Sequence, residues 1–195
     1  MSATKLLAAA SLSAVLAFGQ AAAQQRITDD FDLAETVETC AACHGADGVP
    51  IEEDIPVLWG QQFYYLYVQM KDYKAGRRAN ETMQPMVEGF TRDQMKALAN
   101  YFAEKPWTDI VAGKDSDRAR AGRSQTVAGQ CSQCHNRYLG DSRIPRLAGQ
   151  QEAYLLRTML EFKHKVRLNS AAKGSLMKSY EDAGIELIAH FLATL

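Results

Sequence analysis

A five-residue pattern, Cys-x-x-Cys-His, occurs twice in this chain, from Cys40 to His44 and from Cys131 to His135. This spacing is typical of covalent haem attachment. Two thiols on one helical turn can bond both vinyl groups of a porphyrin, and the adjacent imidazole can bind the iron. The sequence therefore predicts two covalently bound haem c groups with His44 and His135 as proximal iron ligands. Their thioether bonds would come from four cysteines: Cys40, Cys43, Cys131 and Cys134.

Two other uses of Cys-x-x-Cys fit the sequence less well. A single zinc site would bind all four thiolates and would leave the two following histidines without a role. A redox-active dithiol is expected within a βαβ pattern, which this sequence does not show. With all four cysteines assigned to haem, no disulfide bond is expected.

The sixth iron ligand of the first haem must be a methionine if it comes from the first half, because no histidine follows His44 there. Histidine opposite methionine is a common axial pair in haem proteins that carry electrons. Two methionines fall on apolar helical stripes and are assigned to the core: Met70 and Met95. Met83 and Met86 lie in residues 80–90, where a proline and a glycine predict a loop, and spacing alone does not separate these two candidates.

In the second half the candidate sixth ligand is Met177, in a segment predicted to be a loop before the last helix. Met159 corresponds to the core residue Met70. His190 is assigned to the surface of the last helix, and His164, which lies among charged residues, is assigned to solvent. Without Met177 as a ligand, the second haem would keep an open position, as in a haem enzyme.

Two prolines follow the proximal histidines, Pro56 by twelve residues and Pro145 by ten. A metal-binding imidazole usually donates its other N–H to a carbonyl, which orients the ring and tunes its basicity. The prolines either supply these carbonyls or simply mark turns, and the residues alone leave both readings open.

The elements that must position these residues are helices, arranged in two copies. The halves repeat at offsets between 89 and 91 residues. Apolar residues recur at spacings of three and four in residues 63–73 and 155–162, and again in 95–102 and 185–192. No strand pattern appears. The predicted fold class is all-α, with two tandem helical domains that each wrap around one covalently attached haem.

The N-terminal residues 1–23 have the pattern of a secretory signal peptide, with Lys5, an apolar run and small residues up to Ala23, where cleavage is expected. No later stretch is apolar enough to span a membrane. The mature protein is therefore predicted to be exported to the periplasm. Peripheral membrane association stays compatible with this prediction.

Three further segments complete the predicted domain organisation: domain 1 at 24–108, a linker at 109–114 and domain 2 at 115–195. The first helix of domain 1 is predicted to begin near Thr28 or Asp29, and that of domain 2 near Asp115 or Ser116.

Charge is distributed unequally between the two halves. Residues 24–109 contain 15 acidic and 8 basic side chains, whereas residues 110–195 contain 8 acidic and 13 basic ones. A basic half of this kind attracts a protein partner with an acidic docking face. Nothing in the sequence supports nucleic-acid binding.

Several motifs resemble the diheme cytochrome c4 family: the first haem signature with its flank (40–48), Pro-x-Leu-x-Gly-Gln (56–61 and 145–150) and the run 72–78. The resemblance covers the whole mature chain and implies two class I cytochrome c domains. It also implies that the carbonyls of Pro56 and Pro145 accept the N–H of the proximal histidines. It favours Met83 over Met86 as the sixth ligand.

The second half departs from the family pattern in two places. Residues 136–139 replace the Gly-x-x-Gly that follows the first signature, and the segment with Met177 is displaced along the chain.

The resemblance implies an electron-transfer protein rather than an enzyme. The predicted function is a periplasmic one-electron carrier between respiratory or dehydrogenase donors and a terminal acceptor such as an oxidase. Its partners would be redox proteins: an oxidase, a dehydrogenase or another cytochrome. Two alternatives are an electron-accepting subunit of a periplasmic dehydrogenase complex and a haem enzyme with an open position at the second haem.

Overall fold

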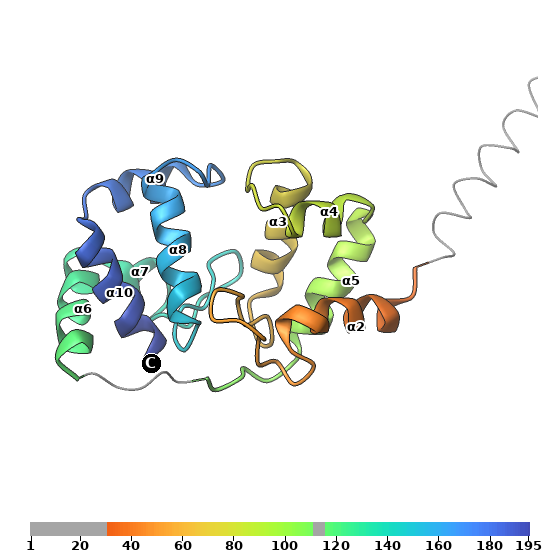
Figure 1. Cartoon of the computed structure of the whole chain (residues 1–195), viewed down its shortest axis with the longest axis horizontal. Helices are drawn as coiled ribbons and strands as arrows, with labels where there is room; N and C mark the ends of the chain where they lie inside the picture. Colours follow the sequence, from red (N-terminus) through yellow and green to blue (C-terminus); the bar gives the residue numbers. More distant parts are fainter. Residues whose placement is uncertain (1–30, 111–115) are drawn as a thin grey trace, which may run out of the picture. The chain divides into compact units, whose positions relative to one another are not determined.

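The computed structural model describes residues 31–110 and 116–195 (Figure 1). Residues Val37–Leu195 belong to one compact unit, and residues 31–36 belong to a separate unit. Several predictions lie outside the described residues: the signal peptide (1–23), the helix starts at Thr28, Asp29 and Asp115, and most of the linker (109–114).

The first half contains four helices in the described residues: α2 (Leu33–His44), α3 (Phe63–Lys74), α4 (Met83–Glu88) and α5 (Arg92–Ala103). Local capping explains where two of them begin. At α2, the Asp32 carboxylate accepts the N–H of Ala34 at 2.8 Å. At α5, Thr91 and Gln94 form a capping box in which each side chain accepts the other residue's backbone N–H.

The second half contains five helices in the described residues: α6 (Ser116–Ala128), α7 (Cys131–Cys134), α8 (Glu152–Lys163), α9 (Ala171–Lys178) and α10 (Asp182–Ala193). α6 begins at one of the two predicted starts, Ser116. Extended structure in the described part of the chain is limited to isolated bridges, such as the one between Arg78 and Arg167. The predicted all-α fold class is confirmed.

Each half has its own apolar core. α3 packs against α4 and α5 in the first half, and α10 packs against α6 and α8 in the second. The buried members of the first cluster are Leu66, Ala99 and Phe102, and those of the second are Leu155, Ile188, Ala189, Phe191 and Leu192. Met70 and Met159 pack against these clusters as partly buried residues, and Met95 is buried. The assignment of these three methionines to the core is therefore supported.

The loop predicted for residues 80–90 is wrong, because this segment contains the helix α4. Pro85 does not prevent the helix because it is the third residue, where a backbone N–H has no partner within the helix. Asn80 also favours the start, since its side-chain oxygen accepts the N–H of Met83 at 2.7 Å.

The loop predicted around Met177 is also wrong, because Met177 lies near the end of α9. This helix begins after Ser170, whose hydroxyl oxygen accepts the N–H of Lys173 at 3.4 Å. A serine before a helix satisfies one of the N–H groups that the first turn leaves free.

The surface position predicted for His190 is wrong as well. His190 is only 3% exposed, and its Nδ1 lies 2.9 Å from the Glu152 carboxylate. Its repeat partner Asn100 is exposed on α5, so the repeat gives no sign of this burial. His164 is exposed, in agreement with its assignment to solvent.

The packing of α6 on α10 requires a glycine at position 122. A Cβ added to Gly122 would lie 2.0 Å from the carbonyl oxygen of Leu187. We expect Gly122→Ala to lower the free energy of unfolding by about 1–3 kcal/mol, as overpacked cores usually do. Denaturant titration of the haem-loaded protein would measure this.

The matched control is Gly184→Ala on α10, where the added Cβ would have no atom closer than 3.7 Å. This variant should leave stability unchanged or raise it by up to about 1 kcal/mol, because alanine favours helix. Equal destabilisation by the two variants would contradict the packing argument.

None of the helices in the described residues is both long and apolar enough to cross a membrane.

Candidate functional site

The first Cys-x-x-Cys-His signature lies in the last turn of α2. Cys40, Cys43 and His44 are spaced three and four residues apart, so the helix brings them to one face. His44 is buried, Cys40 is half-buried and Cys43 is exposed. Two thiols and one imidazole therefore meet at a single helix end, as haem attachment requires.

The second signature has a different backbone. Cys131 and Cys134 form the short helix α7, and His135 follows directly. Gln130, just before α7, has a left-handed backbone with φ 53° and separates this turn from α6. Here too, two thiols and one imidazole are brought together, but on the separate short helix α7 and the residue that follows it.

The sequence departure at residues 136–139 has a structural counterpart. Asn136, Arg137 and Tyr138 all adopt positive φ, at 47°, 51° and 71°. The first half places glycines in such conformations, at Gly45 and Gly48. Left-handed backbone costs a non-glycine residue roughly 1–2 kcal/mol. The segment after the second signature is therefore strained where the first is not.

Both proximal histidines contact a proline carbonyl. Nδ1 of His44 lies 2.9 Å from the Pro56 oxygen, and Nδ1 of His135 lies 3.0 Å from the Pro145 oxygen. A carbonyl oxygen only accepts hydrogen bonds, so Nδ1 must carry the proton in each ring. The lone pair is then on Nε2, the nitrogen that remains for a metal.

Burial keeps both imidazoles neutral at ordinary pH. It lowers the pKa of His44, against the opposing effect of the Pro56 hydrogen bond. Burial also lowers the pKa of His135, to about 4, with a further contribution from the positive charge of Lys173. A neutral imidazole is the form that binds a metal.

None of the four cysteines forms a disulfide bond. Burial raises the pKa of Cys40 and of Cys131. In the described part of the chain, no three or more His, Cys, Asp and Glu side chains gather as a metal site, so the four thiols do not form one tetrahedral zinc site.

The methionine candidates differ in exposure. Met83 is half-buried at the start of α4, and Met86, one turn later, is 39% exposed. Met177 is only 8% exposed, near the end of α9. Whether Met83, Met86 or Met177 binds a haem iron stays a prediction.

A buried polar network, which was not predicted from the sequence, joins the two halves. Arg78 donates to the Tyr154 hydroxyl at 3.1 Å, and Arg167 donates to the Gln69 side-chain oxygen at 2.7 Å. Burial opposes ionisation of Tyr154, but the two arginines still lower its pKa. One signal in the sequence could have suggested this network. Arg78 and Arg167 occupy matching positions in the two copies of the repeat, each two residues before an asparagine (Asn80 and Asn169).

One guanidinium nitrogen of this network has no hydrogen-bond partner among the described residues. Nη1 of Arg167 is buried without a hydrogen-bond partner among the described residues. A buried guanidinium is stable only with an anion or an acceptor nearby. The propionate carboxylates of haem are such groups, so this residue fits the cofactor that the thiols and imidazoles indicate.

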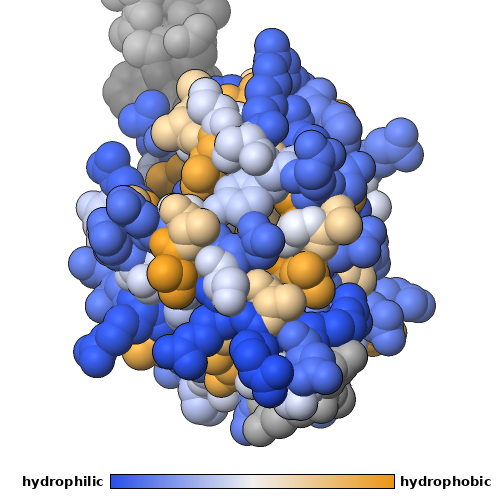
Figure 2. All heavy atoms as spheres, turned by 90° about the vertical axis from the view of Figure 1, so that its left-hand side faces the viewer, coloured by the Kyte–Doolittle hydropathy of each residue, from blue (hydrophilic) through white to orange (hydrophobic). Residues whose placement is uncertain are grey.

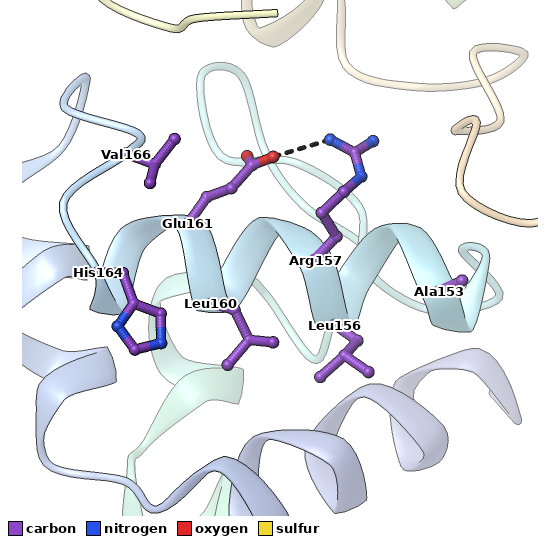
Figure 3. Close-up of a pocket in the computed structure, with 7 residues that line it drawn as sticks. All are labelled: Ala153, Leu156, Arg157, Leu160, Glu161, His164 and Val166. Carbon is purple, nitrogen blue, oxygen red and sulfur yellow. Dashed lines mark hydrogen bonds and ion pairs between the residues drawn. The ribbon is translucent and has the colours of Figure 1, made fainter.

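A groove of about 410 Å³ runs along one face of α8 (Figure 3). Its lining is mainly apolar, and Arg157 and Glu161 form an ion pair at 2.8 Å beside it (Figure 3). No residue of either signature lines this groove.

Comparison with known proteins gives consistent matches. The chain is 34% identical over 159 residues to cytochrome c4 of Thiocapsa roseopersicina, covering 77% of this chain and 82% of the relative. It is 27% identical to the thiosulfate dehydrogenase electron acceptor of Stutzerimonas stutzeri, covering 90% and 88%. The cytochrome c4 structure of Acidithiobacillus ferrooxidans superposes with a TM-score of 0.72 at 27% identity, covering 80% and 98%. No family model matches the chain.

Proposed function

Because this chain belongs to the cytochrome c4 family and carries two covalent haem c groups, we propose that it transfers single electrons between redox proteins in the bacterial periplasm. Members of this family are electron-transfer proteins and not enzymes. The observation that carries the proposal is the pair of neutral proximal imidazoles, each with Nδ1 on a proline carbonyl and Nε2 left for iron.

In this proposal each residue has a defined role at its haem. The bound haem supplies a one-electron Fe(III)/Fe(II) couple. His44 and His135 would hold the two irons through Nε2, and Met83 and Met177 would each supply a further ligand. The carbonyls of Pro56 and Pro145 accept the Nδ1 proton of the imidazoles and so orient the two rings. Arg167 would bind a propionate, and this contact would keep its charge compensated.

The proposed domains are 24–108 and 115–195, joined by the linker 109–114. We also propose that residues 1–23 are removed as a signal peptide, with cleavage near Ala23. The two separate apolar cores described above support a division into two domains.

The proposed docking partner has an acidic face, because the second half carries the excess of basic side chains. On the face shown in Figure 2, hydrophobic residues are scattered among hydrophilic ones. Complementary charge on two protein surfaces speeds their encounter.

Electron exchange with the physiological oxidant should therefore slow as salt rises. We expect the second-order rate constant to fall roughly tenfold between low ionic strength and about 0.5 M, because salt screens attraction between exposed charges. Stopped-flow kinetics would measure this. Exchange with a small uncharged redox reagent is the control and should stay constant. A flat salt profile with the protein partner would rule out charge-steered docking.

A second candidate function is favoured by the match to a thiosulfate dehydrogenase electron acceptor. In that case the protein would be the electron-accepting subunit of a dehydrogenase complex. Purification from the periplasm distinguishes the two functions. A stoichiometric complex with a dehydrogenase supports the subunit, and a monodisperse free cytochrome supports the carrier.

A further inference from the structure

Two buried glutamines each bind the main chain of the opposite half. The side-chain oxygen of Gln150 accepts the N–H of Val57 at 2.9 Å, and its amide nitrogen donates to the Val57 carbonyl at 3.0 Å. Gln61 makes the same pair of bonds with Arg146, at 2.8 and 3.0 Å. Both glutamines are 3% exposed. The contact is thus reciprocal, and each half supplies one glutamine.

The orientation of these side-chain amides is fixed by their neighbours. The oxygen of Gln61 also accepts the N–H of Gln62 at 2.9 Å, and that of Gln150 accepts the N–H of Gln151 at 2.9 Å. A flipped amide would place its NH₂ against two N–H donors, which cannot accept a hydrogen bond. The oxygen therefore faces the opposite half's N–H at both positions.

The peptide groups that the glutamines bind are the ones that hold the proximal histidines. The N–H of Val57 belongs to the same peptide group as the Pro56 carbonyl, which accepts the His44 proton. The N–H of Arg146 belongs to the same peptide group as the Pro145 carbonyl. A continuous hydrogen-bonded path therefore runs from each imidazole, through one peptide group, to a glutamine of the other half.

Hydrogen bonds in such a path strengthen one another. When the N–H of a peptide group donates a bond, its carbonyl oxygen gains negative charge and becomes a better acceptor. A better acceptor pulls the imidazole proton and makes the imidazole more basic. A more basic ligand stabilises Fe(III) relative to Fe(II), so the reduction potential falls.

We propose that Gln150 positions and tunes the His44 ligand of the first haem and that Gln61 does so for the His135 ligand of the second. Each half thereby sets part of the potential of the other half's haem. This inference rests on the proposed ligation by His44 and His135.

The test is a redox titration of haem-loaded Gln150→Met, with the two waves assigned to their haems by NMR of the haem methyl groups. Loss of the bond should make reduction of the first haem roughly 1.3- to 4.6-fold more favourable, if coupling is about 10–30% of a hydrogen bond to a charged group. At 59 mV per tenfold change, this is a positive shift of about 7–39 mV. The second haem should not shift.

Two further variants complete the experiment. Gln61→Met should give the mirror result, a positive shift at the second haem only. Gln150→Glu keeps an acceptor oxygen for the Val57 N–H and should return the first potential to the wild-type value or below it. Gln151→Met is the matched control, since among the described residues its side chain makes no hydrogen bond to the other half, and both potentials should stay constant.

A merely structural role predicts a different result. If Gln150→Met shifts the haem of its own half, shifts both haems equally or shifts neither, the inference is wrong. Failure of the proposed function would show earlier, because the wild-type protein would then lack two one-electron waves with histidine-ligated spectra. Should Gln150→Met not fold, the Gln61→Met and Gln150→Glu titrations decide the question alone.

Discussion

Replacing Cys40 and Cys43 together with serine should remove one haem group and leave the first half without a stable core. Among the described residues, the buried cluster there is small and contains Leu66, Ala99 and Phe102. Domains of this size bury limited apolar surface, so a covalent group must supply much of the missing contact area. Without it, α3 and α5 keep only the small cluster that they share.

Three measurements check this result. The mass of the purified protein should fall by one haem, its visible absorbance per chain should fall to about half, since one of two groups remains, and its far-ultraviolet helix signal should decrease. Serine at Cys131 and Cys134 is the matched variant and should remove the other haem. A double-serine protein that retains both haems, or that unfolds at the wild-type temperature, would contradict the prediction.

Replacing Met83 with alanine should have the largest effect on redox behaviour. If its sulfur binds the first iron, the variant loses the sixth ligand, and the first haem becomes high-spin and open to carbon monoxide. Its potential should fall by on the order of 0.2 V, within the range of about 0.8 V that axial ligands set. Optical spectra and a redox titration would show both changes.

Met86→Ala is the control, because Met86 lies one turn further along α4 and is already 39% exposed. Its spectrum should match the wild type, and its stability should change by less than about 0.5 kcal/mol, as for other surface substitutions. If Met86→Ala becomes high-spin while Met83→Ala stays low-spin, Met86 is the ligand. Met177→Ala provides the same test for the second haem.

The sequence was sufficient for the features that depend on local spacing. The duplicated signature predicted two covalent haems, and the three-and-four spacing predicted the all-α fold; the comparisons and the structure confirm both. The signature also led to His44 and His135, whose rings the structure places against Pro56 and Pro145. Their role as iron ligands stays a prediction.

The features that depend on contacts between distant residues could not be predicted. His190 was expected on the helix surface as the repeat partner of Asn100, but it is buried and contacts Glu152 and Arg118 in the folded chain. The helix around Met83 was missed because a proline argues against helix unless it is known to lie in the first turn. The helix around Met177 was missed because the segment is short. The glutamine contacts join residues more than eighty positions apart, which no local pattern reveals.

The exchange of glutamines between the halves affects how the protein can be dissected. Producing each half alone is a common way to separate two overlapping spectroscopic signals. Here a fragment that ends before Gln150 would leave the N–H of Val57 facing water, and its imidazole would rest on an altered carbonyl. Spectra and reduction potentials obtained from such fragments would describe the fragments alone. Combining them would not reproduce the properties of the intact cytochrome.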